Sequence, residues 1–131
     1  MTVGKGAVIS SSLKQKINTR SSTEAELVAS DDALSSILWS KNFLKAQGYR
    51  PKVILNQDNQ STMKLQQNGK ASSHKRTKHI DIRYFTIKDY LDRQELGVEY
   101  CPTESMQADY LSKPLQGKQF EYQRRLIMGL S

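Results

Sequence analysis

Three acidic residues lie in settings where a carboxylate could do chemistry. Glu26 falls in the first turn of an expected long helix, Asp58 follows the apolar half of "KVILNQDNQST" (Lys52 to Thr62), and Asp109 falls within an expected short helix. Carboxylates gathered at the C-terminal ends of sheet strands suit Mg²⁺, which takes oxygen ligands. Two such ions about 3.5–4 Å apart can activate a water and stabilise the leaving oxygen in phosphodiester cleavage. These three acids are therefore candidate metal ligands and catalytic residues.

Each acid also has a purely structural explanation. Glu26 lies three residues after Thr23, which is the spacing of a capping box. Asp58 could cap the helix that follows it. Asp109 could be a solvated helix acid, as most aspartates at protein surfaces are. No single acid decides between the two explanations.

Length and charge limit the class of protein. A chain of 131 residues suits one domain covering residues 1–131. Twenty Lys and Arg against thirteen Asp and Glu give a formal charge of +7, with clusters in Lys70–Arg83 and at Arg124 and Arg125. This charge favours a polyanionic partner, although an excess of this size can also simply solvate the surface.

Cysteine usage and hydropathy exclude several classes. The single cysteine, Cys101, rules out an internal disulfide and a cysteine-based metal cage, and it favours a reducing compartment. No apolar run approaches the roughly 20 residues of a membrane span, and the N-terminus lacks the apolar block of a signal peptide. We therefore expect no membrane partner.

The pattern of apolar and turn residues predicts the elements that must position the acids. Apolar residues at helical spacing followed by a glycine indicate a helix and its end, and β-prone runs bounded by turn residues indicate strands. The alternation of the two predicts an α/β fold with a mixed sheet. The expected elements are a strand or hairpin arm within residues 6–18, a helix from Thr23 to Ala46, a strand from Lys52 to Asn56, a helix from after Asp58 to Gln67, a helix from Ile80 to Gln94, a strand from Val98 to Cys101, a helix over "TESMQADYLSK" with Thr103 as cap, and a last helix over "KQFEYQRRLIM".

Five segments, in this order and spacing, resemble the ribonuclease H domain of copia-type (Pseudoviridae-like) LTR retrotransposon Gag-Pol polyproteins. Together they span nearly the whole chain, and five in register are far more specific than any one. The segments are "SSTEAELVA" (Ser21 to Ala29), "QDNQS" (Gln57 to Ser61), "KRTKHIDIRY" (Lys75 to Tyr84), "VEYCPTESMQADYLSKPLQG" (Val98 to Gly117) and the closing "LIMGL".

The resemblance implies a ribonuclease H-like mixed sheet flanked by helices. It also implies Mg²⁺-dependent hydrolysis of the RNA strand of RNA–DNA hybrids during reverse transcription. In such domains the acids of the "TEAEL" helix, of the "DNQS" strand end and of the "AD-L-K" helix bind two Mg²⁺ ions, or Mn²⁺ in their place. Those positions are Glu26, Asp58 and Asp109 in this sequence.

The same resemblance names nucleic-acid contacts. Thr23 and Gln60 are similar in position to residues that read the 2′-hydroxyls across the minor groove, with Asn59 a weaker candidate. Helix capping and turn chemistry are the alternative for all three, and they explain Thr23 about as well as a nucleic-acid contact does and Gln60 less well. In the basic motif the candidate contacts are Lys75, Arg76, Lys78, His79 and Arg83. His79 matches the motif, but a cap or a phosphate contact explains it as well as catalysis does, and we assign no function to His74.

The resemblance is incomplete at the N-terminus. A ribonuclease H site uses a fourth acid, an aspartate on the first strand, and no acid precedes Glu24 in this sequence. We expect a domain that is N-terminally truncated, with the first strand and most of the second absent and a gap beside Lys52–Asn56. Cleavage by residues 1–131 alone is then expected to fall far below that of a complete domain, and whether Met1 is a natural start stays open.

The implied partners are an RNA–DNA hybrid and the upstream reverse transcriptase region of the same polyprotein, in the cytoplasm within a virus-like particle or in the nucleus. A different class remains in competition, namely a non-catalytic nucleic-acid-binding module that uses Lys70–Arg83 and keeps the acids as caps. Its binding would weaken with salt and be indifferent to divalent ions. A general integrase-like nuclease is a weaker alternative, because the spacing of "TEAEL…DNQS…KHIDIRY" does not match its acids.

Overall fold

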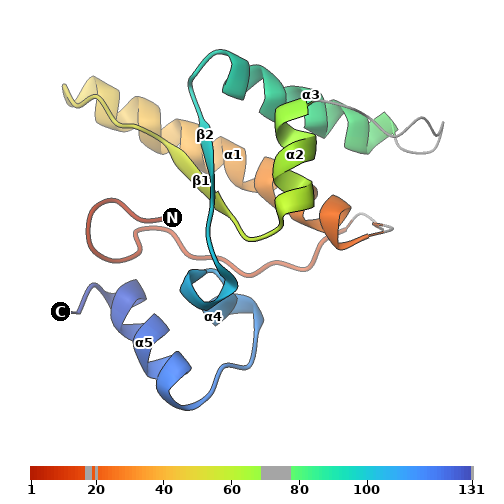
Figure 1. Ribbon diagram of the computed structural model, residues 1–131. Coiled ribbons are helices and arrows are strands. Elements are labelled where there is room, and N and C mark those ends of the chain that lie inside the picture. The colour runs from red at the N-terminus through yellow and green to blue at the C-terminus, as the bar shows by residue number, and fades with distance from the viewer. Residues whose placement is uncertain (17–18, 20, 69–77, 131) are drawn as a thin grey trace. The chain divides into compact units, whose positions relative to one another are not determined.

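The structure, a computed structural model, describes residues 1–16, 19, 21–68 and 78–130, without the side chains of residues 65–68, 78–81 and 84. Helices and short strands alternate along the chain (Figure 1). In order, the elements are helix α1 (Ser22–Ala46), strand β1 (Ile54–Gln57), helix α2 (Gln60–Asn68), helix α3 (Lys78–Asp92), strand β2 (Gly97–Tyr100), 3₁₀ helix η1 (Thr103–Ser105), helix α4 (Asp109–Ser112) and helix α5 (Gly117–Met128).

The chain divides into two compact units. One unit, here called the α1–β2 unit, covers Ile17–Tyr100, and the other, called the α5 unit, combines Met1–Lys16 with Cys101–Ser131. Each unit is described by itself below. The single domain expected for residues 1–131 stays a prediction.

Helix α1 begins and ends at residues whose chemistry explains its bounds. Ser21 has extended backbone dihedrals, and its side-chain oxygen accepts a hydrogen bond of 3.2 Å from the amide of Glu24, as an N-cap residue does. At the other end Gly48 has a φ of +89°, and the amide of Tyr49 donates to the carbonyl of Leu44 at 3.0 Å. This is the left-handed glycine ending in which main-chain amides satisfy the last free carbonyls. The predicted helix and its stop are confirmed.

The two described strands form a parallel pair. Ile54 lies opposite Gly97 and Gln57 opposite Tyr100. The side chain of Leu55 packs against the core, whereas Ile54 is exposed, which is the alternation expected of a strand with one covered face. The structure therefore bears out a short strand on either side of α2 and α3, shifted by one or two residues from its expected bounds.

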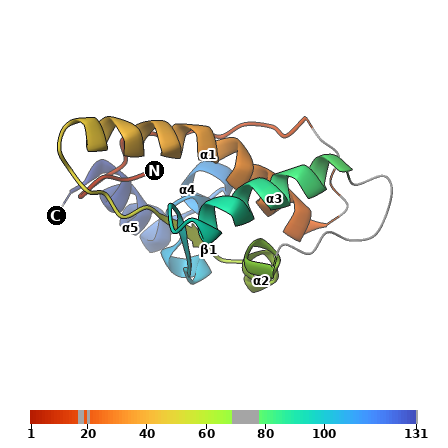
Figure 2. The same cartoon turned by 90° about the horizontal axis from the view of Figure 1, so that it is seen from above.

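The core of the α1–β2 unit is small and lies between α1, α3 and the strand pair (Figure 2). Burying a side chain of this size stabilises the fold by roughly 1.5–3 kcal/mol, so the few buried residues account for much of the stability of the unit. The buried cluster consists of Leu27, Leu34, Ile87 and Leu96, with Leu38, Val53, Leu55, Tyr90 and Leu91 packed against it.

Helices α2, α3 and α5 confirm the predictions of helices to Gln67, from Ile80 and over "KQFEYQRRLIM" within about two residues. Boundary differences of this size are ordinary, because helix ends fray and often close with 3₁₀ turns. Among the helices that the structure describes, none combines the length and the apolar character needed to cross a bilayer.

The predicted strand or hairpin arm within residues 6–18 is wrong for the described part of that range. In the described part of this range the strand-like pairing is short: Ala7 forms an isolated antiparallel bridge to Thr2, and Val8 and Ile9 are hydrogen-bonded to the backbone of Met1. The amide of Ala7 donates instead to the carbonyl of Ile127, at 2.8 Å. A β-prone run forms a strand only when a neighbouring strand satisfies its backbone groups, and no described strand lies beside this one. Residues 17 and 18 lie outside the described residues.

The predicted helix over "TESMQADYLSK" is also wrong as one element. The chain forms η1, leaves helical dihedrals at Met106 with a ψ of 101°, and resumes a helix only at Asp109. Thr103 is the first residue of η1 and not its cap, and Pro102 precedes it without a side-chain capping bond. A 3₁₀ turn rarely extends beyond three or four residues, so the two short helices stay separate.

The described sheet is smaller than the mixed sheet that the sequence predicts. Within the described residues the sheet has two parallel strands, and antiparallel pairing is limited to the bridge between Thr2 and Ala7. The alternation of helices and strands agrees with an α/β class. The ribonuclease H-like arrangement stays a prediction.

Candidate functional site

Asp58 stands at the C-terminal end of β1, between the strand and helix α2. Asp58 is half-buried. The neighbouring Asn59 performs the capping, because its side-chain oxygen accepts hydrogen bonds from the amides of Ser61, at 3.0 Å, and Thr62, at 3.2 Å. The interpretation of Asp58 as the cap of α2 is therefore wrong. The Asp58 carboxylate lies at the end of the strand and does not cap the helix that follows.

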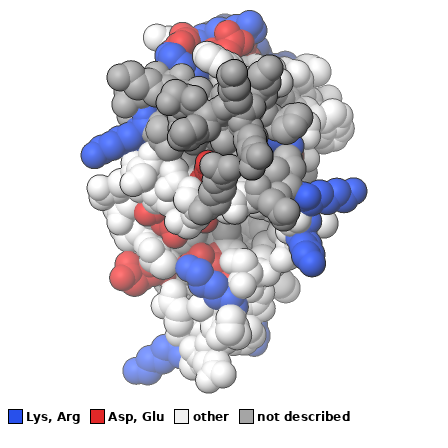
Figure 3. Space-filling model, turned by 90° about the vertical axis from the view of Figure 1, so that its right-hand side faces the viewer, with Lys and Arg blue, Asp and Glu red and all other residues white. Residues whose placement is uncertain are grey.

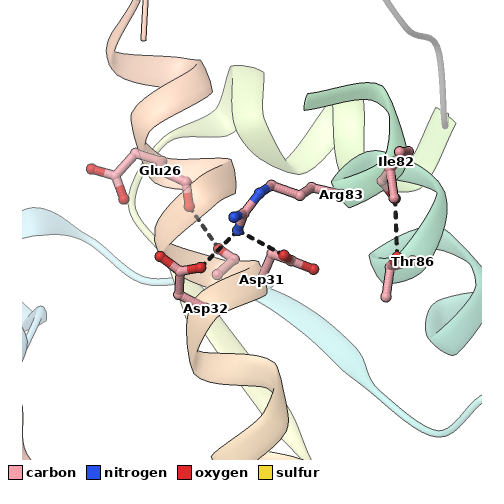
Figure 4. A network of polar contacts seen from close by, with 7 residues as sticks. Glu26, Asp31, Asp32, Ile82, Arg83 and Thr86 are labelled. Carbon is pink, nitrogen blue, oxygen red and sulfur yellow. Dashed lines mark hydrogen bonds and ion pairs between the residues drawn. The ribbon is translucent and has the colours of Figure 1, made fainter. Parts of the chain in front are cut away.

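Glu26 projects from α1, one turn after the helix begins. The capping box between Thr23 and Glu26 does not form. Ser21 caps the helix instead, and its side-chain oxygen accepts a hydrogen bond from the amide of Glu24. Thr23 lies inside the helix. Figure 4 shows the Glu26 carboxylate pointing away from the guanidinium of Arg83. Glu26 is half-buried. Its position in the first turns of a long helix is confirmed, but the helix is capped by Ser21 and not by Thr23.

A hydrogen bond joins the two segments that carry Glu26 and Asp58. The hydroxyl of Thr62, which is fully buried, donates to the carbonyl of Thr23 at 3.4 Å. The first turn of α2 thus packs on the first turn of α1. The structure brings the end of β1 and the start of α1 to the same region of the α1–β2 unit.

Asp109 belongs to the α5 unit and is not a solvated acid. It is the first residue of α4 and only 9% exposed, and the Lys113 ammonium lies 2.8 Å from its carboxylate, one helical turn later. The solvated interpretation of Asp109 is wrong, because the residue is buried and paired with Lys113. Since Asp109 and the other two acids belong to separately described units, their meeting in one site stays a prediction.

The residues present fit a hard divalent cation in their chemistry. Mg²⁺ is usually held by one or two carboxylates together with waters and substrate phosphate. Glu26 and Asp58 supply two half-buried carboxylates from adjoining segments. In the described parts of the chain no three or more His, Cys, Asp or Glu side chains gather closely enough to hold a metal.

The candidate minor-groove residues have different surroundings. Thr23 is half-buried, and its carbonyl receives the Thr62 hydroxyl. The Asn59 side-chain oxygen is occupied as the cap of α2. Gln60, the first residue of α2, is exposed. Capping therefore explains Asn59 but neither Thr23 nor Gln60, whose contact with nucleic acid stays a prediction.

Arg83 is engaged within the protein, which sequence reasoning did not anticipate. Its guanidinium lies 2.8 Å from Asp31 and 2.7 Å from Asp32 on α1 (Figure 4). Burial raises the pKa of Asp31, and Arg83 lowers it by less. The pKa of Arg83 is raised, mainly by its hydrogen bond to Asp32. The adjacent aspartates in "SDDA" were the available signal. A phosphate contact by Arg83 stays a prediction and would require sharing this guanidinium.

The remaining candidates fall outside what the structure describes. Lys75 and Arg76 lie outside the described residues, and Lys78 and His79 begin α3 without described side chains. On the face that Figure 3 shows, Lys and Arg side chains are interspersed with Asp and Glu. Charges of both signs therefore share this face.

Three curated proteins are similar to nearly the whole chain. It is 35% identical over 127 residues, 96% of its length, to the retrovirus-related Pol polyprotein from transposon TNT 1-94 of Nicotiana tabacum. Against the corresponding polyproteins from transposons RE1 and RE2 of Arabidopsis thaliana the identity is 37% over 85% of the chain and 35% over 89%.

The similarity covers a small part of each relative. The chain spans 9% of the tobacco polyprotein and 8% of each Arabidopsis polyprotein. No protein-family model and no solved structure matches the chain. The homologues of this chain are thus retrovirus-related Pol polyproteins of plant transposons, and its sequence corresponds to one short stretch of them.

Proposed function

We propose that the chain is a ribonuclease H-like segment of a retroelement Pol polyprotein, which hydrolyses the RNA strand of RNA–DNA hybrids with Mg²⁺. Similarity to Pol polyproteins over most of the chain supports a retroelement origin. The motifs "TEAEL", "DNQS" and "AD-L-K" support the specific activity. The net charge of +7 suits a nucleic-acid substrate.

The observation that carries the proposal is the placement of Asp58. A carboxylate at the C-terminal end of a parallel strand is where α/β folds commonly place ligand-binding groups. The ordinary structural use of such an acid is capping, and Asn59 already fills that role. Asp58 therefore remains available for binding a cation.

The residues divide the work between metal and substrate. Glu26 and Asp58 would hold the cation, and β1 and α1 fix the backbone from which each projects. When bound, the cation would activate a water and neutralise charge on the phosphate. Gln60, exposed at the start of α2, would donate to a 2′-hydroxyl and so distinguish RNA from DNA.

A single-turnover cleavage assay tests the proposal. The purified chain, in excess over a short hybrid labelled on its RNA strand, is expected to cut that strand slowly with Mg²⁺ and not with EDTA. Asp58→Asn and Glu26→Gln should each lower the rate by about 10²–10³-fold, since a lost ligand removes several kcal/mol of charge stabilisation.

Matched controls are available in the same unit. Asp89 and Glu99 are exposed and pair only with the exposed cations Arg93 and Lys52. Asp89→Asn and Glu99→Gln should cleave like the wild type. Cleavage that survives both Asp58→Asn and Glu26→Gln would refute the proposed function.

The charge also favours a second function, a non-catalytic nucleic-acid-binding module. Such a module would bind the hybrid without cutting it. Its affinity would fall with salt and would not respond to Mg²⁺ beyond screening. Hybrid binding that is unchanged by Asp58→Asn, together with no Mg²⁺-dependent cleavage, would favour this function.

A further inference from the structure

Helix α5 presents an exposed basic face that the proposed site does not use. Lys118, Tyr122 and Arg125 are spaced by four and three residues, so they share one side of the helix. All three are exposed, as is the adjacent Arg124. We call Lys118, Tyr122 and Arg125 the α5 basic face.

The opposite side of α5 is fixed by contacts within its own unit. The side-chain amides of Gln119 and Gln123 donate to the carbonyl of Glu104, at 2.9 and 3.1 Å, and Gln123 is fully buried. The ring of Phe120 stacks on Tyr110 with centroids 5.3 Å apart. These contacts hold the rotation of α5 about its axis, so the α5 basic face is a fixed outward surface.

The N-terminal segment adds a further cation beside this face. A Cβ on Gly129, the left-handed residue that ends α5, would lie 3.2 Å from the carbonyl of Lys5. The backbone of the exposed Lys5 therefore lies next to Gly129, at the C-terminal end of α5. The one acid on the exposed side of α5, a helix that the structure describes in full, is Glu121.

Among the residues that the structure describes, no acid pairs with the cations of this face. Across the described residues, the ion pairs involve other lysines and arginines and none of Lys5, Lys118, Arg124 or Arg125. By contrast, Lys88 in α3 and Arg93 directly after its end each pair with an aspartate four residues away. Unpaired cations on a rigid helix attract an extended polyanion, because binding releases the counterions condensed on it.

We infer that the α5 basic face, with Lys5 beside it, binds the sugar-phosphate backbone of an RNA–DNA hybrid. Lys118 and Arg125 lie seven residues apart, about 10.5 Å along the helix at 1.5 Å per residue, so they reach separate phosphates. Tyr122 between them donates its hydroxyl to the backbone. The inference deepens the proposed function and rests on it for the choice of ligand.

The test is the salt dependence of hybrid binding, measured by fluorescence anisotropy without Mg²⁺. Lys118→Gln with Arg125→Gln should lower the slope of log affinity against log salt by about 1.4–1.8, at roughly 0.7–0.9 per phosphate contact, and weaken binding at least about tenfold at 0.1 M salt. Glu121→Gln should tighten binding, because it removes the opposing charge from the same face.

The matched control removes the same charge elsewhere. Lys88→Gln with Arg93→Gln also deletes two cations, but both are neutralised by aspartates, so the slope should change by much less. Equal slopes for the two double variants, or no hybrid binding by the wild type, would overturn the inference. So would an equal loss of affinity for polyglutamate, which would show attraction to any polyanion. The proposed function fails by a different result, hybrid binding with no Mg²⁺-dependent cleavage.

Discussion

At the scale of single residues, the three candidate acids have lost the structural explanations that their sequence positions suggested. Asn59 caps α2 in place of Asp58, and Ser21 caps α1 in place of Thr23. Asp109 is buried against Lys113. A capping partner is chosen by local backbone geometry, which the spacing of residues does not reveal. Capping therefore does not account for Glu26 or Asp58, and the chemical interpretation of the three acids stays a prediction.

Asp31 supports a prediction about pH. Burial raises the pKa of its carboxyl above the ordinary value of 3.8, so its contribution to stability is full below that value and is lost as pH rises through the raised pKa. Asp31→Asn carries no such titration and leaves Asp32 paired with Arg83. Between about pH 3 and pH 7, urea unfolding should show the stability of the wild type falling relative to Asp31→Asn. A constant difference between the two proteins would contradict the burial of Asp31.

At the scale of elements, helix caps give the sharpest separation between structure and function. Asn59→Ala removes the acceptor for two amides of α2 and should lower the free energy of unfolding by about 1 kcal/mol. Asp58→Asn should change it by less than about 0.5 kcal/mol, as expected for a substitution that removes no cap. Urea unfolding of the two variants measures both values. A larger loss for Asp58→Asn than for Asn59→Ala would mean that Asp58 supports the fold.

The elements that could be predicted from sequence are those determined by local signals. Helix α1 was predictable because its apolar residues recur at helical spacing and Gly48 stops it. Residues 6–16 were not, since a strand depends on a partner that no local pattern announces. The break at Met106 was missed for a related reason: helical spacing says which residues could share a face, but not where the backbone leaves the helix.

At the scale of the whole molecule, the candidate acids are divided between the two units, with Glu26 and Asp58 in the α1–β2 unit and Asp109 in the α5 unit. A strand end and the first turn of a packed helix often meet in α/β folds, and the bond from Thr62 to Thr23 joins the first turns of α2 and α1. That Glu26 and Asp58 act together stays a prediction. The engagement of Arg83 by Asp31 and Asp32 could not be predicted, since it depends on the packing of α3 against α1. The net charge indicated a polyanionic partner. That no acid among the described residues pairs with the cations of α5 could be learned only from the structure.

The affinity for Mn²⁺, a spectroscopic substitute for Mg²⁺, tests the central claim most directly, because it reports on the carboxylates without requiring turnover. Electron paramagnetic resonance titration of the wild type, Asp58→Asn and Asp89→Asn compares a proposed ligand with an exposed acid of the same unit. We predict that Asp58→Asn weakens Mn²⁺ binding at least about tenfold, which is about 1.4 kcal/mol, while Asp89→Asn binds like the wild type. Equal Mn²⁺ affinity in all three folded proteins would contradict the assignment of Asp58 as a metal ligand.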